Sequence, residues 1–563
     1  MIFKDSKITA ILLIVIILAG FVTAGGCLMA EQEKTLTGMP PEQNDIISKV
    51  YNGSIIIGIE YAMPGMAETF SELGVDAVKY YPDEISWERM QETRYSPIDF
   101  RRMDRFVREY QDAGFKDLVI TLKTEGSWAI KDPIRNYSPK PENLDDYEKW
   151  VRAIVERYDK DGTDDMPGLK EPVMLYEIGS QFSDLEPEPA YDYIIMLERA
   201  YRAAHNASDD VIVTHAAFIV TTAFKDDPGP GDYEASFDSV DKRIMSHSLS
   251  DIRKVLDRPD IFDAVNFHAV GDPYEIEKTV KWLDYEMDQR GYKKPVIIGD
   301  TAATPFIAWG PATVWDKEPS RMGILIPPAT EEDRYRLSKF FQRLIEGDKD
   351  TRNWTQSFVA SDMVKKVIVA SEQDVMLIDT ALMEDLTLFK SELYRGASGI
   401  SPWGGMALTN ISTSDQERTI IELRPLFYAL KQLNKNIGDY TSVERVPTSD
   451  DSIRLYKYNK DNRTVWVAWY EPGKLLLPGD EVAPQQLQVV TNATSIVVER
   501  SIVRKGQVWP DMDIVKPENG IAVIDIDTEP AYIRADGTVY SIEDVKKINS
   551  EPATTSSALV LGS

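Results

Sequence analysis

The chain has 563 residues, of which 43% are hydrophobic, and its formal net charge at pH 7 is −29. This length suits a large barrel joined to a smaller module, and the hydrophobic content supplies a sizeable core, which argues against general disorder. The negative charge argues against nucleic acid as a partner, because phosphate binding requires clustered Lys and Arg, and it indicates instead a solvated acidic surface.

The start of the chain predicts an export signal. Lys4 and Lys7 precede the apolar run Ile8–Val22, which the small residues 24–26 connect to Cys27. A basic start, an apolar centre and small residues at the end are typical of a cleavable signal. The apolar run is short for a spanning helix, which needs ~20 residues, although an uncleaved anchor stays open as the alternative.

The end of this segment, AGGC, resembles a lipobox, in which Cys27 would become the first mature residue and carry a lipid. Cys27 is the only cysteine, so no intramolecular disulfide can form. Residues 28–48 are polar, contain Pro40-Pro41 and predict a tether. We therefore expect residues 1–27 to export the protein to the outer face of the cell membrane, where a lipid or an uncleaved anchor holds it.

The sequence is rich in the triplet that accepts N-linked glycans. Seven of its asparagines begin an Asn-x-Ser/Thr triplet, more than chance alone would place. This enrichment agrees with an exported, N-glycosylated chain. The seven are Asn52, Asn136, Asn206, Asn353, Asn410, Asn462 and Asn492.

Residues 49–437 predict a (β/α)8 TIM barrel. Eight short, nearly continuously apolar runs are typical of parallel strands buried on both faces. They cover residues 54–61, 75–81, 116–124, 172–179, 210–218, 263–270, 294–300 and 374–380. Helical patterns lie between them at 97–113, 144–158, 191–204, 276–289 and 332–346. Doubly wound folds seldom need so many regular units, so the α/β barrel is the preferred prediction.

Residues 438–540 change to a two-residue alternation of apolar and polar side chains. Runs such as SIRLYKY, TVWVAWY and GIAVIDI are separated by turn residues. This pattern predicts a small antiparallel β-sandwich as an accessory domain. Residues 541–563 are rich in Ser and Thr and predict a disordered tail.

Several segments together resemble the clan A retaining glycoside hydrolases, a superfamily of (β/α)8 barrels. Segment 152–179 resembles the approach to the family's fourth strand, which ends in Trp-Glu-Ile-Gly-Asn-Glu-Pro. Segments 262–270 (FDAVNFHAV) and 293–302 (KKPVIIGDTA) are similar to its sixth and seventh strands. Segments 424–434 and 528–533 resemble the helix that closes the barrel and a late sandwich strand. The resemblance implies a carbohydrate partner, a polysaccharide or glycoside bound where the strands' C-terminal ends open.

Carried over residue by residue, the resemblance puts Gln181 at the acid/base position and Asp300 at the nucleophile position. Ser180 replaces the family's sugar-binding Asn, Phe182 replaces its Pro, and Glu177 corresponds to a structural Glu. A retaining glycosidase needs two carboxyl groups ~5–5.5 Å apart, one of which delivers a proton. The amide of Gln181 cannot deliver one, and Asp300 is one methylene shorter than Glu. We therefore expect standard retaining hydrolysis to fail.

Other carboxylates could replace the missing acid. Asp184 and Glu186 follow the strand that carries the acid/base position, and Glu60 and Glu125 lie at or just past the ends of two other strands. Paired with Asp300 at a wider separation, one of them could support an inverting mechanism in which water attacks. The alternative is that they are ordinary polar loop residues.

Further residues are candidates for binding the sugar. His268 is expected at the same barrel mouth, where it would hydrogen-bond the sugar or Asp300, or else serve as a satisfied core histidine. Trp128, Trp309 and Trp403 fall in loops after the third, seventh and eighth strands. Their indole rings suit the C–H faces of a sugar, although ordinary packing is the alternative for each.

Metal and cofactor sites are not predicted. The loop YDKDGTDDMPG carries Asp159, Asp161, Asp164 and Asp165, which suits either calcium or a solvated acidic turn. Its spacing does not match an EF-hand, so we favour the turn. The histidines lack metal-ligand spacing, and we find no P-loop, Rossmann fingerprint or nucleophile elbow.

Three hypotheses follow for function. The first is a surface-anchored, glycoside-hydrolase-like protein that binds carbohydrate in a barrel-mouth cleft without efficient cleavage. The second is an active glycoside hydrolase with a rearranged carboxylate pair that includes Asp300. The third is a non-catalytic envelope scaffold, because a fold does not fix a function.

Overall fold

The computed structural model describes thirteen stretches of the chain, and Cys27 together with the predicted export signal, most of the predicted tether and the predicted tail lies outside them. The described residues are 47, 51–182, 186–220, 223–224, 226–239, 247–301, 331–384, 404–412, 416–460, 463–474, 476–535, 537 and 539–541. Within these ranges, no helix is both long and apolar enough to cross a membrane.

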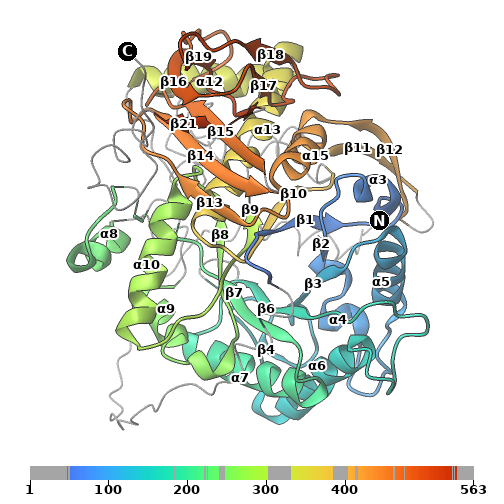
Figure 1. Cartoon of the computed structure of the whole chain (residues 1–563). Helices are drawn as coiled ribbons and strands as arrows, with labels where there is room; N and C mark the ends of the chain where they lie inside the picture. The colour runs from blue at the N-terminus through green and yellow to red at the C-terminus, as the bar shows by residue number, and fades with distance from the viewer. Residues whose placement is uncertain are drawn as a thin grey trace, which may run out of the picture.

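Eight parallel strands form a closed barrel, as predicted (Figure 1). Their order around the sheet is β7-β6-β3-β2-β1-β10-β9-β8, and parallel bridges from Thr214 to Ala264 and from Phe218 to Phe267 join the two ends. The strands are β1 (Ile56–Ala62), β2 (Ala77–Tyr80), β3 (Asp117–Leu122), β6 (Leu175–Gln181), β7 (Ile212–Ala217), β8 (Val265–Ala269), β9 (Val296–Thr301) and β10 (Leu377–Leu382).

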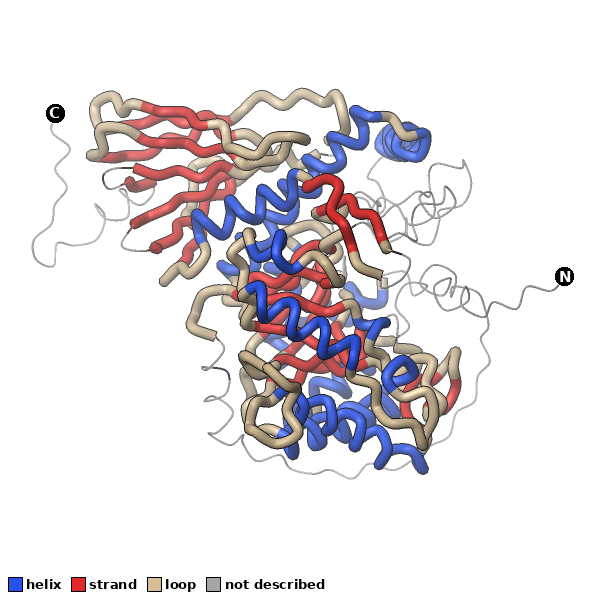
Figure 2. The backbone as a smooth tube through the Cα atoms, turned by 90° about the vertical axis from the view of Figure 1, so that its right-hand side faces the viewer, coloured by secondary structure: helices blue, strands red, loops and turns tan. Residues whose placement is uncertain are grey.

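Helices cover the outside of the barrel (Figure 2). In α5, apolar residues recur at helical spacing, so Met103, Phe106, Val107 and Tyr110 face the core, and the helix ends at Gly114 with a φ of 106°. The helices are α3 (Ala67–Ser71), α4 (Trp87–Met90), α5 (Arg101–Ala113), α6 (Leu144–Tyr158), α7 (Ala190–Ala207), α8 (Tyr233–Asp238), α9 (Leu249–Leu256), α10 (Glu275–Gln289), α12 (Glu331–Glu346), α13 (Lys349–Glu372) and α15 (Pro425–Ile437).

The longest of these helices, α13, has no counterpart among the sequence predictions. It lies between the barrel and the C-terminal domain, where Ser371 Oγ is 2.5 Å from Tyr458 Oη and where α13 also packs against α10 and α15. A helix that is covered on several sides carries buried residues all around and lacks a single apolar stripe. The helical period that revealed its neighbours is therefore absent from its sequence.

The C-terminal domain is an antiparallel two-sheet structure, which confirms the predicted β-sandwich. The larger sheet has the order β13 (Ser442–Arg445), β14 (Ile453–Lys460), β15 (Arg463–Tyr470), β20 (Ala531–Ala535), β17 (Ile496–Arg500) and β18 (Met512–Val515). The smaller sheet has the order β19 (Ile521–Ile526), β16 (Gln485–Thr491) and β21 (Val539–Ser541). Two hairpins decorate the barrel, β4–β5 (Ile130–Asp132, Asn136–Pro139) and β11–β12 (Ala407–Ile411, Arg418–Leu423).

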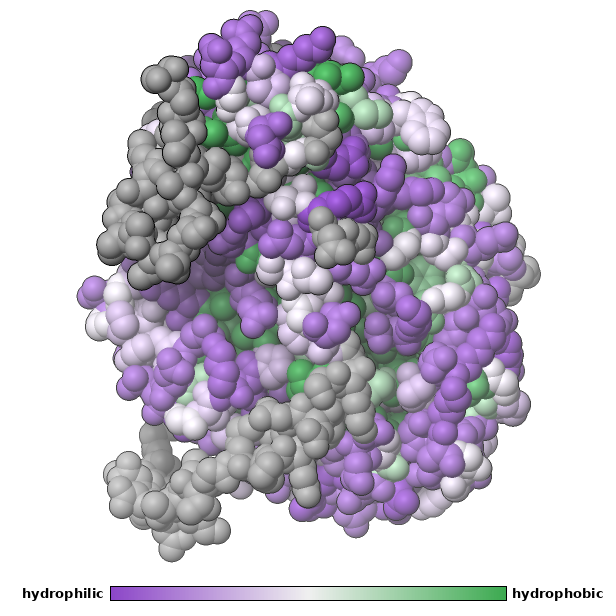
Figure 3. All heavy atoms as spheres, viewed as in Figure 1, coloured by the Kyte–Doolittle hydropathy of each residue, from purple (hydrophilic) through white to green (hydrophobic). Residues whose placement is uncertain are grey.

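The sandwich is fixed to the barrel through its larger sheet. The buried rings of Tyr456 and Trp469 belong to the same continuous core as the barrel helices. The indole N–H of Trp469 donates to the Tyr274 hydroxyl at 2.7 Å, and the Gln432 amide donates to Glu499 at 2.8 Å. Outside these contacts the molecule is polar, and most of the face shown in Figure 3 is hydrophilic, in agreement with the acidic composition.

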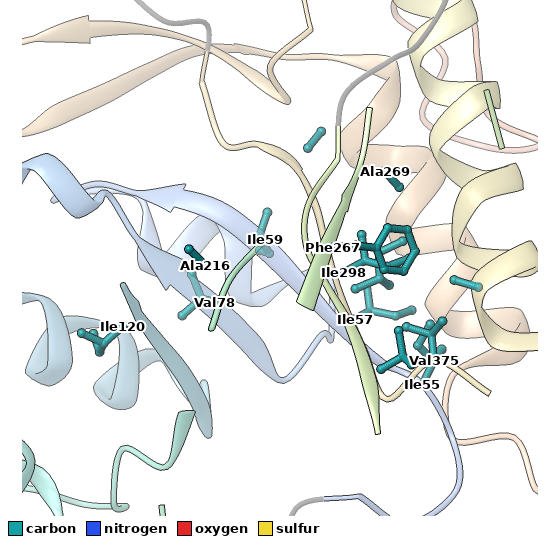
Figure 4. Close-up of a cluster of buried hydrophobic side chains, with 14 of the residues drawn as sticks. Ile55, Ile57, Ile59, Val78, Ile120, Ala216, Phe267, Ala269, Ile298 and Val375 are labelled. Atoms are coloured by element: carbon teal, nitrogen blue, oxygen red, sulfur yellow. The ribbon is translucent and has the colours of Figure 1, made fainter. Parts of the chain in front are cut away.

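The inside of the barrel is layered. One residue of each strand or its flank forms an apolar floor, namely Ile56, Ala77, Val119, Leu175, Ile212, Ala264, Ile297 and Leu377. Two residues further along each strand, the layer is polar, namely Gly58, Lys79, Thr121, Glu177, Thr214, Asn266, Gly299 and Asp379. The side chains between them point outward, so Ile57, Ile59 and Ile298 pack against the surrounding elements (Figure 4).

Gly299 is required in the polar layer because a Cβ at this position would lie 2.3 Å from Glu177 Oε1 and 2.8 Å from Asn266 Oδ1. We expect Gly299→Ala to destabilise the protein by about 1–3 kcal/mol through overpacking, measured by urea unfolding. Gly231→Ala is the matched control, since nothing lies within 4 Å of its added Cβ. Equal stability of the two variants would contradict the close packing of the layer.

Candidate functional site

Register shifts shape the ends of the two strands that carry the predicted catalytic positions. In β6, Ile178 pairs with His215 but the next pair is Gln181 with Ala217, and Gly179 between them has a φ of 80°. In β9, the pairing skips Gly299, so that His268 on β8 lies opposite Asp300. Such bulges change the direction in which side chains point at barrel rims. The alternation of β6 side chains between the lumen and the outside, which would put Glu177, Gly179 and Gln181 on the same side, is therefore interrupted before Gln181.

The bulges bring Gln181, His268 and Asp300 together. The Gln181 amide nitrogen is 3.0 Å from His268 Nδ1, and the same ring nitrogen is 3.9 Å from Asp300 Oδ2. The Asp300 side chain is 19% exposed, whereas His268 is buried. Burial lowers the pKa of His268 well below its usual value, so the ring is neutral at pH 7.

Glu60 at the end of β1 contacts Asp300 directly. Both oxygens of Glu60 are buried, and its carboxyl hydrogen-bonds that of Asp300. Burial and the charge of Asp300 raise the pKa of Glu60 well above its usual value, so protonated Glu60 donates to Asp300. Burial also raises the pKa of Asp300. Two carboxyl groups in hydrogen-bond contact cannot both ionise, and the pair holds a proton.

Lys79 on β2 lies below this pair in the polar layer. Its ammonium is 2.8 Å from Glu177 and 3.3 Å from Glu60, and it donates to the Gly299 carbonyl at 2.6 Å. Burial disfavours its charge, but the charges of Glu177 and Glu60 outweigh burial and raise the pKa of Lys79. Lys79 was not a predicted site residue, although a lone Lys inside the apolar run VDAVKYY was a visible signal.

Glu177 is held on all sides in the lumen, as a structural residue would be. Thr121 donates to it at 2.5 Å and the Asn266 amide at 3.0 Å, in addition to the contact with Lys79. The Asn266 carbonyl oxygen in turn accepts from the backbone N–H of Gly299 at 3.1 Å. This network fixes the backbone immediately before Asp300.

Asp379 on β10 is a fully buried carboxyl whose two oxygens lack a hydrogen-bond partner. Burial, followed by the charges of Glu177 and Asp300, raises its pKa well above the usual value, although Lys79 opposes the shift. Asp379 Oδ1 occupies the space next to Gly58, where the Cβ of any larger residue would lie only 2.1 Å from this oxygen.

Tyr61 forms the rim next to Glu60. It has a φ of 55°, a conformation that costs of order 1–3 kcal/mol for a side chain other than Gly and that concentrates at ligand sites. Its half-buried ring meets the ring of Tyr81 edge-on, with centroids 4.9 Å apart. These two tyrosines were not predicted, and they supply aromatic surface at the ends of β1 and β2.

Two of the remaining candidate acids, Glu186 and Glu125, contact other groups. Glu186 Oε1 accepts the Ser180 backbone N–H at 2.7 Å, so both residues are occupied in shaping the strand end. Glu125 is 3.3 Å from Lys123, which also binds Asp83. Asp184 lies outside the described residues.

Trp128 packs into the protein next to the barrel mouth. Its ring lies 5.5 Å from that of Trp87, and its indole N–H donates to the Gln91 carbonyl at 3.1 Å. These contacts fit the packing alternative better than a sugar-stacking surface. Trp309 and Trp403 lie outside the described residues.

The predicted glycosylation positions differ in exposure. Four of them are exposed, namely Asn52, Asn206, Asn410 and Asn492. Asn136 is half-buried and donates to Asp192 at 2.7 Å, and Asn353 is half-buried within α13. Asn462 is outside the described part of the chain. The exposed four are the positions that a glycan could occupy without rearrangement.

The acidic loop after α6 brings oxygens of Asp159, Asp161 and Asp165 within 4.8 Å of one another. These carboxylates mainly cap the turn, because Asp165 accepts the backbone N–H groups of Lys160 and Gly162 at 3.0 and 2.9 Å.

Comparison with known proteins places the fold. No protein-family model and no curated protein matches the sequence. Glycoside hydrolases are among the solved structures with a similar fold. One is a family 39 glycoside hydrolase from Bacteroides cellulosilyticus, with a TM-score of 0.54 and 11% identity over 86% of this chain and 81% of that chain. Another is a glucosidase from Croceicoccus marinus, with a TM-score of 0.50 and 12% identity over 86% and 96%. The chain therefore has a glycoside-hydrolase-like fold.

We expect Asp379→Asn to stabilise the protein at pH 8 by about 1 kcal/mol or more, because it removes a buried charge without changing shape. The pKa of Asp379 is raised in the folded state, so its charge costs the wild type stability as pH rises above the unfolded pKa of ~3.9. The gain should shrink as pH is lowered toward 4, measured by urea unfolding. Asp209→Asn, at an exposed position, is the control, and an Asp379→Asn variant less stable at every pH would contradict this assignment.

Proposed function

We propose that the protein is an exported, membrane-tethered, glycoside-hydrolase-like protein that binds carbohydrate at the barrel mouth and has lost standard retaining hydrolysis. The observation that carries this proposal is the site itself. The resemblance to the clan A hydrolases puts an amide, Gln181, at the acid/base position, while Asp300 shares a hydrogen bond with Glu60. The fold supports a carbohydrate-shaped site, and its chemistry supports binding rather than cleavage.

The acid step is the first that fails. The amide of Gln181 can hydrogen-bond a sugar oxygen but holds no ionisable proton, and general acid–base help contributes typically 10²–10⁴-fold. His268 contacts Gln181 but is a poor substitute, because burial keeps its ring neutral. A leaving glycosidic oxygen next to Gln181 would therefore depart unprotonated.

The nucleophile step is also weakened. Retaining enzymes keep their two carboxyl groups ~5–5.5 Å apart so that one attacks while the other transfers the proton. Here Asp300 instead accepts a hydrogen bond from Glu60, which withdraws electron density from the attacking oxygen. Asp300 is also one methylene shorter than the family's Glu, and misplacement by ~1 Å costs about 10²-fold.

A second candidate function is hydrolysis by the Glu60–Asp300 pair itself. The specific observation in its favour is that Glu60 keeps a proton beside the exposed Asp300 at neutral pH. A water activated by Asp300 could then attack, provided that substrate binding separates the two carboxyl groups to the ~6.5–9.5 Å of an inverting enzyme. The same experiment distinguishes this candidate from the binding function.

We expect the wild-type chain to bind at least one glycan in a panel of aryl glycosides and polysaccharides without turning it over. Asp300→Ala should weaken that binding about tenfold or more, because it removes the exposed acceptor at the mouth. Gln181→Glu should restore an acid and raise turnover by roughly 10²-fold or more. Binding is measured by calorimetry and turnover by released aglycone or reducing ends.

Gln289→Glu, at an exposed position on α10, is the matched control and should leave both measurements unchanged. Wild-type turnover that disappears in Asp300→Ala would overturn the binding function in favour of the second candidate. A panel without any bound glycan would overturn both and favour the envelope scaffold.

The tether generates a separate prediction. If AGGC is processed as a lipobox, Cys27→Ala should prevent lipid attachment, and labelled palmitate should no longer be incorporated. If the apolar run instead remains as an anchor, the variant should stay in the membrane fraction without label. Release of the unlabelled wild type into the soluble fraction would contradict membrane tethering by either route.

A further inference from the structure

The barrel lumen holds more acid than base. Glu60, Glu177, Asp300 and Asp379 converge on the single ammonium of Lys79. That ammonium is already committed to Glu177, to Glu60 and to the Gly299 carbonyl. No contact of the Lys79 ammonium with either Asp300 or Asp379 is present among the described residues.

Within the described residues, the charges on the neighbouring elements do not restore the balance. His268 on β8 is neutral. Lys366 on α13 lowers the pKa of Asp300 from a distance, but its ammonium is 3.4 Å from Asp362 and donates to the Ala269 carbonyl at 3.2 Å. The charge of Lys366 is therefore largely balanced by Asp362, and carboxyl groups still outnumber ammonium groups around Asp300.

One of the acids, Asp379, also lacks a donor. Both of its oxygens are buried without a hydrogen-bond partner among the described residues. A buried carboxyl group that is neither paired nor hydrogen-bonded is costly, and it is stabilised by any cation that reaches it. Asp300 is the member of the group that a ligand can touch, because 19% of its side chain is exposed.

A metal ion does not fit this arrangement as well as an ammonium group. Within the described part of the chain, only the acidic turn after α6 brings three candidate ligand atoms within 4.8 Å of one another. The lumen carboxyl groups are too dispersed for the six to eight oxygen ligands of Ca²⁺. A primary ammonium needs only one or two carboxylate oxygens to form a charge-assisted hydrogen bond.

We propose that the barrel mouth recognises a glycan that carries a free amino group, with its ammonium seated on Asp300 above Glu60. This substrate class rests on the proposed carbohydrate-binding function. An ammonium group stabilises the ionised form of the Glu60–Asp300 pair, whereas a hydroxyl group supplies only a donor. The net charge of −29 attracts a cationic glycan and repels uronates and sulfated glycans.

Such binding is coupled to protons. Because the Glu60–Asp300 pair holds a proton, an ammonium that favours the ionised pair must expel it. Affinity therefore rises with pH through the titration of the pair, until the amine of the ligand deprotonates. A neutral or N-acetylated glycan leaves the pair's proton in place, so its affinity lacks this dependence.

The test compares a β-1,4-glucosamine oligomer with its fully N-acetylated counterpart by titration calorimetry on the full chain at pH 6. Each titration is repeated in two buffers of different ionisation enthalpy, and the difference in binding enthalpy gives the number of protons released. We expect the amine to bind at least tenfold more tightly and to release protons, and the N-acetylated oligomer to release none. Asp300→Asn and, independently, Glu60→Gln should remove the proton release and most of the tenfold preference.

Asp209→Asn, an isosteric loss of an exposed carboxylate, should behave as the wild type. Equal affinity for both oligomers, or tighter binding of the N-acetylated one without proton release, would overturn the amino-sugar inference and leave the carbohydrate-binding function intact. Binding of neither oligomer, together with a neutral-glycan panel that also fails, would overturn the proposed function. If only the neutral panel binds, the amino-sugar inference alone is wrong.

Discussion

The interior of this barrel depends on one buried ammonium. Lys79 contacts Glu177 and Glu60 and donates to the Gly299 carbonyl, so it connects β1, β2, β6 and β9 at one point. Removing one partner from such a buried network costs about 3–5 kcal/mol, because the remaining charges lose their compensation. The same ammonium lies beneath Asp300 and therefore influences the protonation of the whole mouth.

The sequence resemblance predicts an acid at the end of β6, where Gln181 stands, whereas the structure has buried carboxyl groups on β1 and β10, namely Glu60 and Asp379. A separated acid and nucleophile favour bond cleavage, whereas adjoining carboxyl groups that share a proton favour holding a cation.

The sequence predicted the strands that carry this site better than the side chains that interact within it. All eight barrel strands follow from continuous apolar runs, and the three residues Gln181, His268 and Asp300 do meet. The roles of Lys79 and Asp379 could not be predicted, because they depend on distances across strands far apart in sequence. The left-handed backbone of Tyr61 carries no local signature such as Gly or Asn, and α13 lacks an apolar stripe.

Several features of the barrel mouth lower the stability of the fold, which argues that the mouth has a function. Tyr61 holds a strained φ of 55°, and Asp379 buries two oxygens that have no hydrogen-bond partner among the described residues. Each feature lowers stability, and apolar residues in the lumen would avoid the last of them. A scaffold whose outer surface alone served a function would gain nothing from these features. A ligand that brings a hydrogen-bond donor or a cation to this mouth would offset part of the stability lost through these features, because ligand binding stabilises the folded state.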